Sequence, residues 1–327
     1  MAKQLIVGAE AIKAKGWFGA YKWLILRRIS QLSILGLFLL PVLPGRLSES
    51  TGGFFASFWN SLLDQWPSLE GMWVVKGNLA ASMTLDVLPL TDPHILLQAI
   101  FAGVEPHRDA IIGVIIVIGF YLLVSGRVYC SWVCPVNMVT DAASWLRRKL
   151  GIKSSARITR STRYWMLGLT LVLPLVTGSI VWELFNPVSM LFRGIVFGLG
   201  TAWVLVLSVF LFDLLVSKDG WCGRLCPVGA FYSLLGTKSP LRVVATKREA
   251  CDDCMDCFAV CPEAQVIKPA LKGESKGIGP VILSSNCTNC GRCIDVCAKD
   301  VFNFGSRFSG VEMNKVSGTA GQQHNPG

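Results

Sequence analysis

Apolar side chains along this chain are gathered in long, nearly uninterrupted runs rather than alternating with polar ones. Four such runs stand out, over residues 29–44, 110–126, 164–182 and 194–216. An α-helix needs about 20 apolar residues to cross roughly 30 Å of hydrocarbon. Each run comes close to that length, the first when it borrows the apolar residues before Arg27 and Arg28. The pattern therefore predicts four transmembrane helices.

Composition and the placement of charge agree with this prediction and add an orientation. Charged residues make up 16% of the chain, against about 25% in an ordinary soluble domain. Residues 1–28 hold six Lys or Arg and residues 127–163 hold eight, whereas segment 44–109 holds three against seven acids. By the positive-inside rule both termini lie in the cytoplasm. We therefore expect a multi-pass protein of a bacterial inner membrane, with lipid as its surroundings, and we expect no nucleic-acid partner despite the net charge of +10.

Two common cofactor classes have no motif here. The sequence lacks G-x-G-x-x-G and G-x-x-x-x-G-K-[ST], which argues against a nucleotide or dinucleotide site. It holds three histidines, and none lies inside an apolar run. A haem held between spanning helices would need axial ligands there, so that cofactor is nearly excluded.

The helical part contains an internal repeat. Asp92-Pro93 in one copy corresponds to Asn186-Pro187 in the other, and each is followed by an aromatic-Cys-x-x-x-Cys-Pro-Val motif. The first cysteine of the motif comes 37 residues after the proline in the first copy and 35 residues after it in the second. The motifs are Tyr129-Cys130-Ser-Trp-Val-Cys134-Pro135-Val136 and Trp221-Cys222-Gly-Arg-Leu-Cys226-Pro227-Val228. Repeats of one orientation imply a pseudo-twofold axis with a shared site at the interface.

That shared site would gather four thiols. Cys130 and Cys134 are four residues apart, as are Cys222 and Cys226, so each pair lies on one face of a continuing helix, which the following proline then ends. We expect the four thiolates to bind a further metal centre, either an iron–sulfur centre or copper, or to form a redox-active dithiol. The competing interpretation is that they are small buried apolar residues.

Eight more cysteines close the sequence in two runs with iron–sulfur spacing. The first is C-x₂-C-x₂-C-x₃-C-P from Cys251 and the second is C-x₂-C-x₂-C-x₃-C from Cys287. This is the bacterial ferredoxin pattern for two [4Fe–4S] clusters, in which the fourth cysteine of each run ligates the other cluster. The expected ligand sets are Cys251, Cys254, Cys257 and Cys297 for one cluster, and Cys287, Cys290, Cys293 and Cys261 for the other. Structural zinc prefers two separated C-x₂-C pairs, which these runs do not form.

Together, the four apolar runs, the duplicated motifs and the terminal ferredoxin resemble the NapH family, the membrane components of some periplasmic nitrate reductase systems. The resemblance covers about residues 15–305 and rests on short stretches that include Thr91-Asp92-Pro93, Trp182-Glu183, Gly220-Trp221-Cys222-Gly and Cys254-Met255-Asp256-Cys257. It implies a quinol dehydrogenase that passes electrons to a NapG-like periplasmic iron–sulfur protein and a c-type cytochrome. Segment 46–72 looks like an insertion.

A quinol site needs a proton acceptor beside it. The candidates are Asp92, His94, Glu183 and Asp213, and the last of these lies inside an apolar run, where an acid is by default a functional hypothesis. The basic stretch 142–150 is expected to form a helix that lies on anionic lipid headgroups, and it is not assigned as a site.

The expected fold is a four-helix membrane domain with an internal repeat over residues 1–236, a C-terminal α+β two-cluster ferredoxin-like domain over 237–305, and a disordered tail over 306–327. Two other functions stay open. The paired cysteines could handle copper, as in NosR-like maturation factors, or the clusters could serve a redox sensor rather than carry current.

Overall fold

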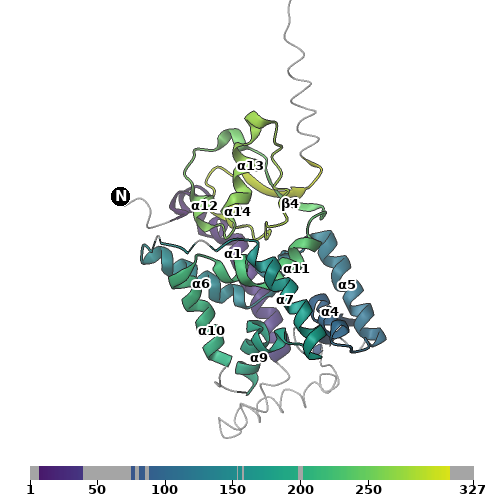
Figure 1. The fold of residues 1–327 in the computed structure, drawn as a ribbon. Coiled ribbons are helices and arrows are strands. Elements are labelled where there is room, and N and C mark those ends of the chain that lie inside the picture. Colours follow the sequence, from purple (N-terminus) through teal and green to yellow (C-terminus); the bar gives the residue numbers. More distant parts are fainter. Residues whose placement is uncertain are drawn as a thin grey trace, which may run out of the picture.

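A computed structural model describes residues 7–39, 75–77, 81–84, 88–152, 154–156, 158–197 and 202–309 of the chain. It has two parts, a helical part and, stacked on one end of it, a smaller part that holds the C-terminal cysteine runs (Figure 1). Helix α1 (Ala9–Leu39) runs from beside the smaller part along the helical part. Segment 46–72 and the tail from residue 310 lie outside the described residues.

The helical part is built of short helices joined by tight turns. Its α-helices after α1 are α4 (Pro93–Phe101), α5 (Arg108–Val124), α6 (Val136–Lys149), α7 (Thr162–Thr177), α8 (Trp182–Phe185), α9 (Pro187–Phe197), α10 (Ala202–Leu211) and α11 (Pro227–Leu235). Three single π-helical turns interrupt them, η3 (Tyr129–Val133), η4 (Phe212–Val216) and η5 (Trp221–Leu225). An antiparallel sheet of β1 (Val75–Gly77), β2 (Ala81–Thr84) and β3 (Leu88–Thr91) lies against α5.

The predicted transmembrane helices are not found. Within the described ranges, no helix is both long enough and apolar enough to cross a bilayer. The prediction of a four-helix membrane domain is therefore wrong, and so is the multi-pass inner-membrane location with cytoplasmic termini that rested on it.

The physical reason is that the helices containing the apolar runs are too short, are divided by turns, or carry charged residues. Run 110–126 lies mostly in α5, which has only 17 residues. Run 164–182 is divided between α7, which has 16 residues, and the start of α8. Run 194–216 is split among α9, α10 and the π-helical turn η4. The described part of run 29–44 lies in α1, which also carries Arg27 and Arg28 near its middle and is kinked at Gly16, where φ is 73°. Hydropathy counts apolar residues but does not register such interruptions.

The smaller part is a ferredoxin-like unit with its own core. Strands β4 (Leu241–Ala245) and β5 (Phe302–Ser306) pair antiparallel, from Leu241 opposite Ser306 to Ala245 opposite Phe302. Around them lie η6 (Arg248–Ala250), α12 (Asp256–Val260), η7 (Ala264–Val266), α13 (Ile267–Lys272), η8 (Glu274–Lys276) and α14 (Arg292–Asp295). The buried side chains of Val243, Ile267 and Phe302 centre the core. Burial of such side chains is the main stabilising contribution to a unit of this size.

Helix α1 joins the two parts. The carboxylate of Asp295 in α14 accepts hydrogen bonds from the backbone N–H groups of Trp23 (3.0 Å) and Leu24 (2.9 Å). Asp256 accepts another from Gly8 N–H at 2.9 Å. The Trp23 ring packs against the ferredoxin core and lies 4.6 Å from the Phe304 ring. The two parts are therefore held in one arrangement by an element from the start of the chain.

The segments that flank the repeat meet at a backbone contact between two glycines. A Cβ atom on Gly126 would lie 1.8 Å from the Tyr232 carbonyl oxygen and 2.7 Å from the Gly236 nitrogen. A Cβ atom on Gly236 would lie 2.8 Å from the Gly126 nitrogen. Only glycine fits at either position, because real Cβ contacts do not come closer than about 3 Å.

Candidate iron–sulfur sites

The two copies of the repeated motif have the same backbone structure. In each, the first cysteine lies in a five-residue π-helical turn and the second, Cys134 or Cys226, follows it in an extended conformation. Pro135 and Pro227 then begin the next helices, α6 and α11, instead of ending one. Proline suits a helix start because its fixed φ is already helical and its missing N–H would have no partner there. The prediction of a proline-terminated helix was wrong in this respect.

The structure brings the four thiols of these motifs close together, with each cysteine half-buried. Burial raises the pKa of all four, and the charges of neighbouring thiols add to the rise for Cys134, Cys222 and Cys226; the pKa of Cys226 reaches about 12. Cys130 differs, because Arg127 and Arg163 oppose the effect of burial on its pKa. At the centre, Gly229 leaves room: its Cβ position would be 3.9 Å from the Cys130 sulfur. Four mutually close, half-buried thiols are costly to ionise unless a cationic group binds them.

The eight ferredoxin cysteines surround two separate cavities. One is lined by Cys251, Cys254, Cys257 and Cys297, and the other by Cys261, Cys287, Cys290 and Cys293. The residues between the cysteines curl the loops, since Asp253, Met255, Asn289 and Gly291 all have positive φ. Across the described ranges, no three His, Cys, Asp or Glu side chains converge on a point where one metal ion would bind, and this holds for both the ferredoxin and the repeated cysteines.

Each ferredoxin cavity is suited to a cubane cluster. Four cysteines line it, and the fourth cysteine of each run lies with the opposite set. The donors are all sulfur, which suits iron–sulfur clusters. Which cysteine binds which cluster stays a prediction.

A buried charge network connects the repeated cysteines to the ferredoxin unit. Glu263, two residues after Cys261, accepts a hydrogen bond from Arg127 at 3.1 Å, and Arg163 lies 3.5 Å from the same oxygen. Both arginines and the glutamate are almost fully buried, with 2%, 1% and 3% of their side chains exposed. Although burial opposes it, Arg127 holds the pKa of Glu263 below its ordinary value. The network is therefore ionised and cannot be opened without leaving charges uncompensated.

The turn η3 docks directly on the loop that carries Cys287. Ser131 Oγ donates to the Thr288 carbonyl at 2.8 Å, and Trp132 Nε1 donates to the Asn289 carbonyl at 3.1 Å. Arg127 completes the contact by donating to the Asn286 carbonyl at 2.7 Å. Cys130 therefore lies on an element fixed to the second cysteine run of the ferredoxin.

Three of the predicted proton acceptors lie on one side of the thiol site. Asp92 caps α4 through the His94 N–H at 2.9 Å, and His94 is fully buried. The His94 ring nitrogen Nε2 lies 3.2 Å from Thr170 Oγ1, and Gln98 Nε2 lies 3.0 Å from His94 Nδ1. Burial lowers the pKa of His94 to about 4, so the ring is neutral near pH 7. Burial, with a smaller contribution from Glu183, raises the pKa of Asp92 to about 6.

A tyrosine cluster lies between this polar group and the thiols. The rings of Tyr129 and Tyr232 stack at 4.7 Å between centroids, and Tyr121 meets Tyr232 edge-on at 4.9 Å. Burial raises the pKa of all three, and the charges of Asp92 and Cys130 act in the same direction. The polar group and the thiol site are therefore neighbours across one aromatic layer.

Asp213 does not join the other candidates. Its carboxylate accepts a hydrogen bond from the Trp221 N–H at 2.9 Å and so holds the start of η5. Asp213 Oδ2 has no hydrogen-bond partner within the described part of the chain. Burial raises the pKa of this group to about 7.

Known protein families match the segments that contain both sets of cysteines. A family model described as a 4Fe-4S binding domain matches twice, over residues 109–153 and 199–243, and a 4Fe-4S dicluster domain matches residues 250–301. The ferredoxin-type protein NapH of Haemophilus influenzae is 44% identical over 92% of this chain and 96% of its own length. NapH of Escherichia coli is 42% identical over the same shares. This chain belongs to the NapH family of ferredoxin-type proteins.

A second group of relatives is about as similar to this chain. The methylamine utilization ferredoxin-type protein MauN of Paracoccus denitrificans is 48% identical over 91% of this chain and 95% of its own length. No solved structure matches the chain significantly. The NapH resemblance is thus confirmed, and the protein is a ferredoxin-type electron-transport protein with [4Fe–4S] domains.

Two groups of residues in this NapH-family chain were not foreseen from the sequence. The network of Arg127, Glu263 and Arg163 was missed, although Arg127 and Glu263 stand three and two residues from cysteines. Charges placed so close to expected ligands were the available signal. The tyrosine cluster was also missed, because Tyr121 and Tyr232 come from different helices and no local pattern joins them.

Proposed function

We propose that this chain takes electrons from a quinol and delivers them to an iron–sulfur or cytochrome partner of the nitrate-reduction system, a NapG-like protein or a c-type cytochrome. In this proposal the four thiols of the repeat hold a third iron–sulfur centre beside the two clusters of the ferredoxin. When bound, these centres supply one-electron transfer. The residues of the chain set their positions, their electrostatic surroundings and the fate of the protons.

The description of the matching family as a 4Fe-4S binding domain supports the third centre, since each of its two matches contains one Cys-x-x-x-Cys pair. Arg127 gives the site a buried positive charge, which favours thiolate over thiol at Cys130. Copper, the other metal considered, has no observation that favours it.

One observation supports electron exchange with the ferredoxin more than any other: the docking of η3 on the loop of Cys287. Ser131 and Trp132 donate to that loop, and Arg127 reaches both the loop and Glu263. Cys130 and Cys287 therefore lie on two elements that are joined by direct hydrogen bonds. We infer that the cluster of the second ferredoxin run is the one that exchanges electrons with the thiol site.

The polar group of Asp92, His94 and Glu183 is our candidate for the quinol side. Oxidation of a quinol to a quinone releases two electrons and two protons, so each turnover needs proton acceptors. Asp92, with a pKa of about 6, is ionised at neutral pH yet basic enough to take a proton. Neutral His94 can donate or accept a hydrogen bond at a quinol oxygen. We assign Asp213 to the positioning of η5 instead.

The decisive experiment compares iron content and quinol reduction in wild type and variants. Cys130→Ser and Cys222→Ser should each lower iron from about twelve to about eight atoms per chain, because one of three four-iron clusters is lost. Electron paramagnetic resonance of the oxidised wild type should gain reduced-cluster signals on adding a menaquinol analogue, and the variants should not.

Thr140→Val serves as the matched control. Thr140 Oγ1 lies 3.8 Å from the Cys222 sulfur, so the change alters the same site but keeps all four thiols. It should retain the full iron content. A wild type with about eight irons and bound copper, whose cysteine variants keep eight irons and lose the copper, would favour copper handling. A wild type that dithionite reduces but quinol does not would contradict quinol as the donor and leave the sensor interpretation standing.

A further inference from the structure

A large cavity lies between α1, α6 and the ferredoxin unit, away from the thiol site. It has a volume of about 840 Å³, within the range of sites that bind small molecules. Leu24, Met138 and Val260 are among its apolar walls, and its polar lining comes from five cationic side chains and two carboxylates. The cations are Arg27, Arg28, Arg148, Lys149 and Arg292, and the acids are Asp141 and Asp295. The lining therefore carries a net charge of +3.

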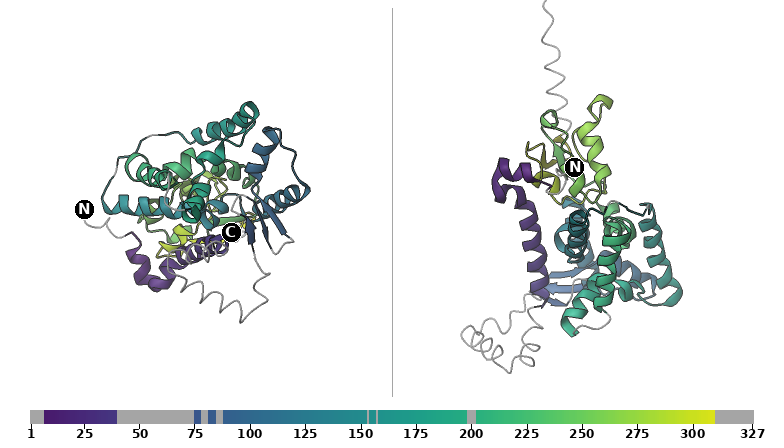
Figure 2. Two further views of the ribbon diagram at one scale, coloured as in Figure 1. Left: turned by 90° about the horizontal axis from the view of Figure 1, so that it is seen from below. Right: turned by 90° about the vertical axis from the view of Figure 1, so that its left-hand side faces the viewer.

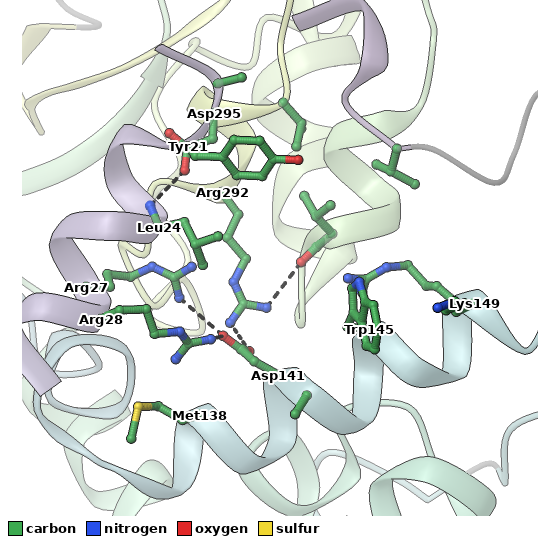
Figure 3. A pocket seen from close by; sticks show the side chains of 16 residues that line it. Tyr21, Leu24, Arg27, Arg28, Met138, Asp141, Trp145, Lys149, Arg292 and Asp295 are labelled. Atoms are coloured by element: carbon green, nitrogen blue, oxygen red, sulfur yellow. Dashed lines mark hydrogen bonds and ion pairs between the residues drawn. The ribbon is translucent and has the colours of Figure 1, made fainter. Parts of the chain in front are cut away.

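The two carboxylates are already engaged. Three guanidinium groups share Asp141: Arg28 at 2.5 Å, Arg27 at 3.6 Å, and Arg292 (Figure 3). Asp295 uses its two oxygens on the backbone of α1. Asp141 and the neighbouring Asp219 also act on Arg148, but Asp141 is shared by three guanidinium groups, so the lining keeps a net positive charge.

Arg27 shows the shortage of acceptors directly. Its side chain is 1% exposed, and its Nε and Nη1 atoms have no hydrogen-bond partner among the described residues. Burial and the nearby Arg292 lower the pKa of Arg27. A buried cation with unused N–H groups costs free energy, and an anion in the cavity would reduce that cost.

The rim adds aromatic surface. Trp145 of α6 is 54% exposed, and Lys149 Nζ lies 5.2 Å from the centroid of its ring. Tyr21 of α1 lies on the opposite wall (Figure 3). The buried Arg27 with its neighbouring arginines at one end and aromatic rings at the rim suit a ligand with a charged oxyanion at one end and a flat ring at the other.

We propose that this cavity binds a phosphate-bearing aromatic small molecule, with the phosphate toward the arginines and the ring at Trp145 and Tyr21. This inference is independent of the proposed quinol site. The cavity borders both cluster regions, since Val260 and Val296 in its lining directly precede Cys261 and Cys297. A bound anion would therefore act on the electrostatic surroundings of both ferredoxin clusters.

The test uses two ligands that differ in one phosphate. Binding of flavin mononucleotide and of riboflavin to the cluster-loaded, oxidised full-length protein is measured by equilibrium dialysis. We expect flavin mononucleotide to bind at least about tenfold more tightly, because charge-assisted hydrogen bonds to the phosphate are lost with riboflavin. Inorganic pyrophosphate should displace it.

Variants locate the binding. Arg148→Gln should weaken flavin mononucleotide about tenfold and leave riboflavin unchanged. Lys268→Gln, which removes one positive charge on α13 outside the cavity lining, is the matched control and should change neither. Cluster absorbance should be equal in all three proteins, which shows that they are folded.

Three results would overturn the proposal: equal affinity for the two flavins, equal effects of Arg148→Gln and Lys268→Gln, or no binding of flavin mononucleotide at millimolar concentration. Should a hexaglutamate peptide bind where the flavin does not, the cavity serves an acidic protein segment instead.

Discussion

The two copies of the repeat share a backbone but differ in almost every side chain that faces the ferredoxin. Three residues before its first cysteine, copy one has Arg127 and copy two has Asp219. Arg127 reaches across to Glu263 and Asn286, whereas Asp219 turns inward and accepts a hydrogen bond from Ser144 at 2.7 Å. The thiol site is thus symmetric in its backbone and asymmetric in its charges.

The same asymmetry continues inside the π-helical turns. Ser131 and Trp132 of copy one donate to the ferredoxin loop, while copy two has Gly223 and Arg224 at these places. Arg224 donates instead to the Ile158 carbonyl at 2.6 Å, within the helical part. The two copies therefore supply four equivalent thiols, but the turn of copy one donates the hydrogen bonds to the loop of Cys287, whereas copy two approaches the ferredoxin through Lys218, which donates to the Ala259 carbonyl at 2.9 Å.

The largest effect should come from the buried charges. Arg127→Met removes the strongest partner of Glu263 and should lower the free energy of unfolding by about 3 kcal/mol, as breaking buried pairs does. Asp219→Asn, at the equivalent place in copy two, should cost about 1 kcal/mol, because its hydrogen bond can persist. Thermal loss of cluster absorbance under anaerobic conditions measures both. Equal costs would mean that the copies are not divided in this way.

Removing the docking hydrogen bonds should have a moderate effect. The double variant Ser131→Ala, Trp132→Phe loses two bonds worth about 1 kcal/mol each, so amide hydrogen exchange in residues 286–290 should accelerate by roughly thirtyfold. Arg224→Gln in copy two should leave exchange there unchanged. If it accelerates exchange equally, both copies hold the ferredoxin.

The next comparison concerns proton transfer and sets Asp92 of the quinol-side group against Asp213, which precedes the motif of copy two. Because burial raises the pKa of Asp92 to about 6, its carboxylate is protonated below that pH and cannot accept a proton. The rate of quinol oxidation should therefore fall by roughly tenfold per pH unit below 6, which gives the pH–rate profile an acidic limb. Asp92→Asn should slow the reaction and remove this limb. Asp213→Asn should keep the limb. A limb that survives in Asp92→Asn would remove Asp92 from the mechanism.

The same pKa predicts a stability effect of known sign. The folded state holds the Asp92 proton more tightly than the unfolded chain, so stability decreases as pH rises from about 4 to about 6 and is constant above. Asp92→Asn should abolish that decrease when thermal unfolding is followed across this pH range.

The smallest effect should come from giving copy two a residue of copy one. A Cβ atom on Gly223 would lie 3.4 Å from the nearest atom, Glu263 Oε1, which is an ordinary contact. Gly223→Ser should therefore change stability by less than about 0.5 kcal/mol. A large loss in thermal unfolding would mean that copy two is tightly fitted against Glu263 after all.

The cysteine positions could be interpreted from the sequence alone. The spacing of Cys251 to Cys297 predicts a two-cluster ferredoxin because short-range geometry governs ligation, and the family match confirms it. Comparison of the two Cys-x-x-x-Cys-Pro motifs predicts that Cys130 and Cys222 come together, and the structure places their thiols within one half-buried group. The metal centre that these thiols bind stays a prediction.

The features that the sequence did not predict have a common cause: they depend on contacts between segments that are far apart in the sequence. Apolar run 194–216 is continuous in sequence, yet it is divided where η4 forms and Asp213 caps η5. Stretch 142–150 looks like a plain basic helix, and only the approach of α1 and α14 makes Arg148 and Trp145 part of a cavity. Figure 2 shows α1 lying along both parts, an arrangement that no local pattern contains.

The contact between Gly126 and Gly236 restricts which substitutions this chain can accept during evolution. A side chain at either place would separate the residues that lead into the first motif from those that follow the second. In a library selected for iron content, both positions should accept glycine alone, whereas Gly119 and Gly168, which have open space around them, should accept alanine. The two copies were thus free to diverge in their side chains but not to drift apart, and a hybrid that exchanges one half with a relative would work only if it kept both glycines.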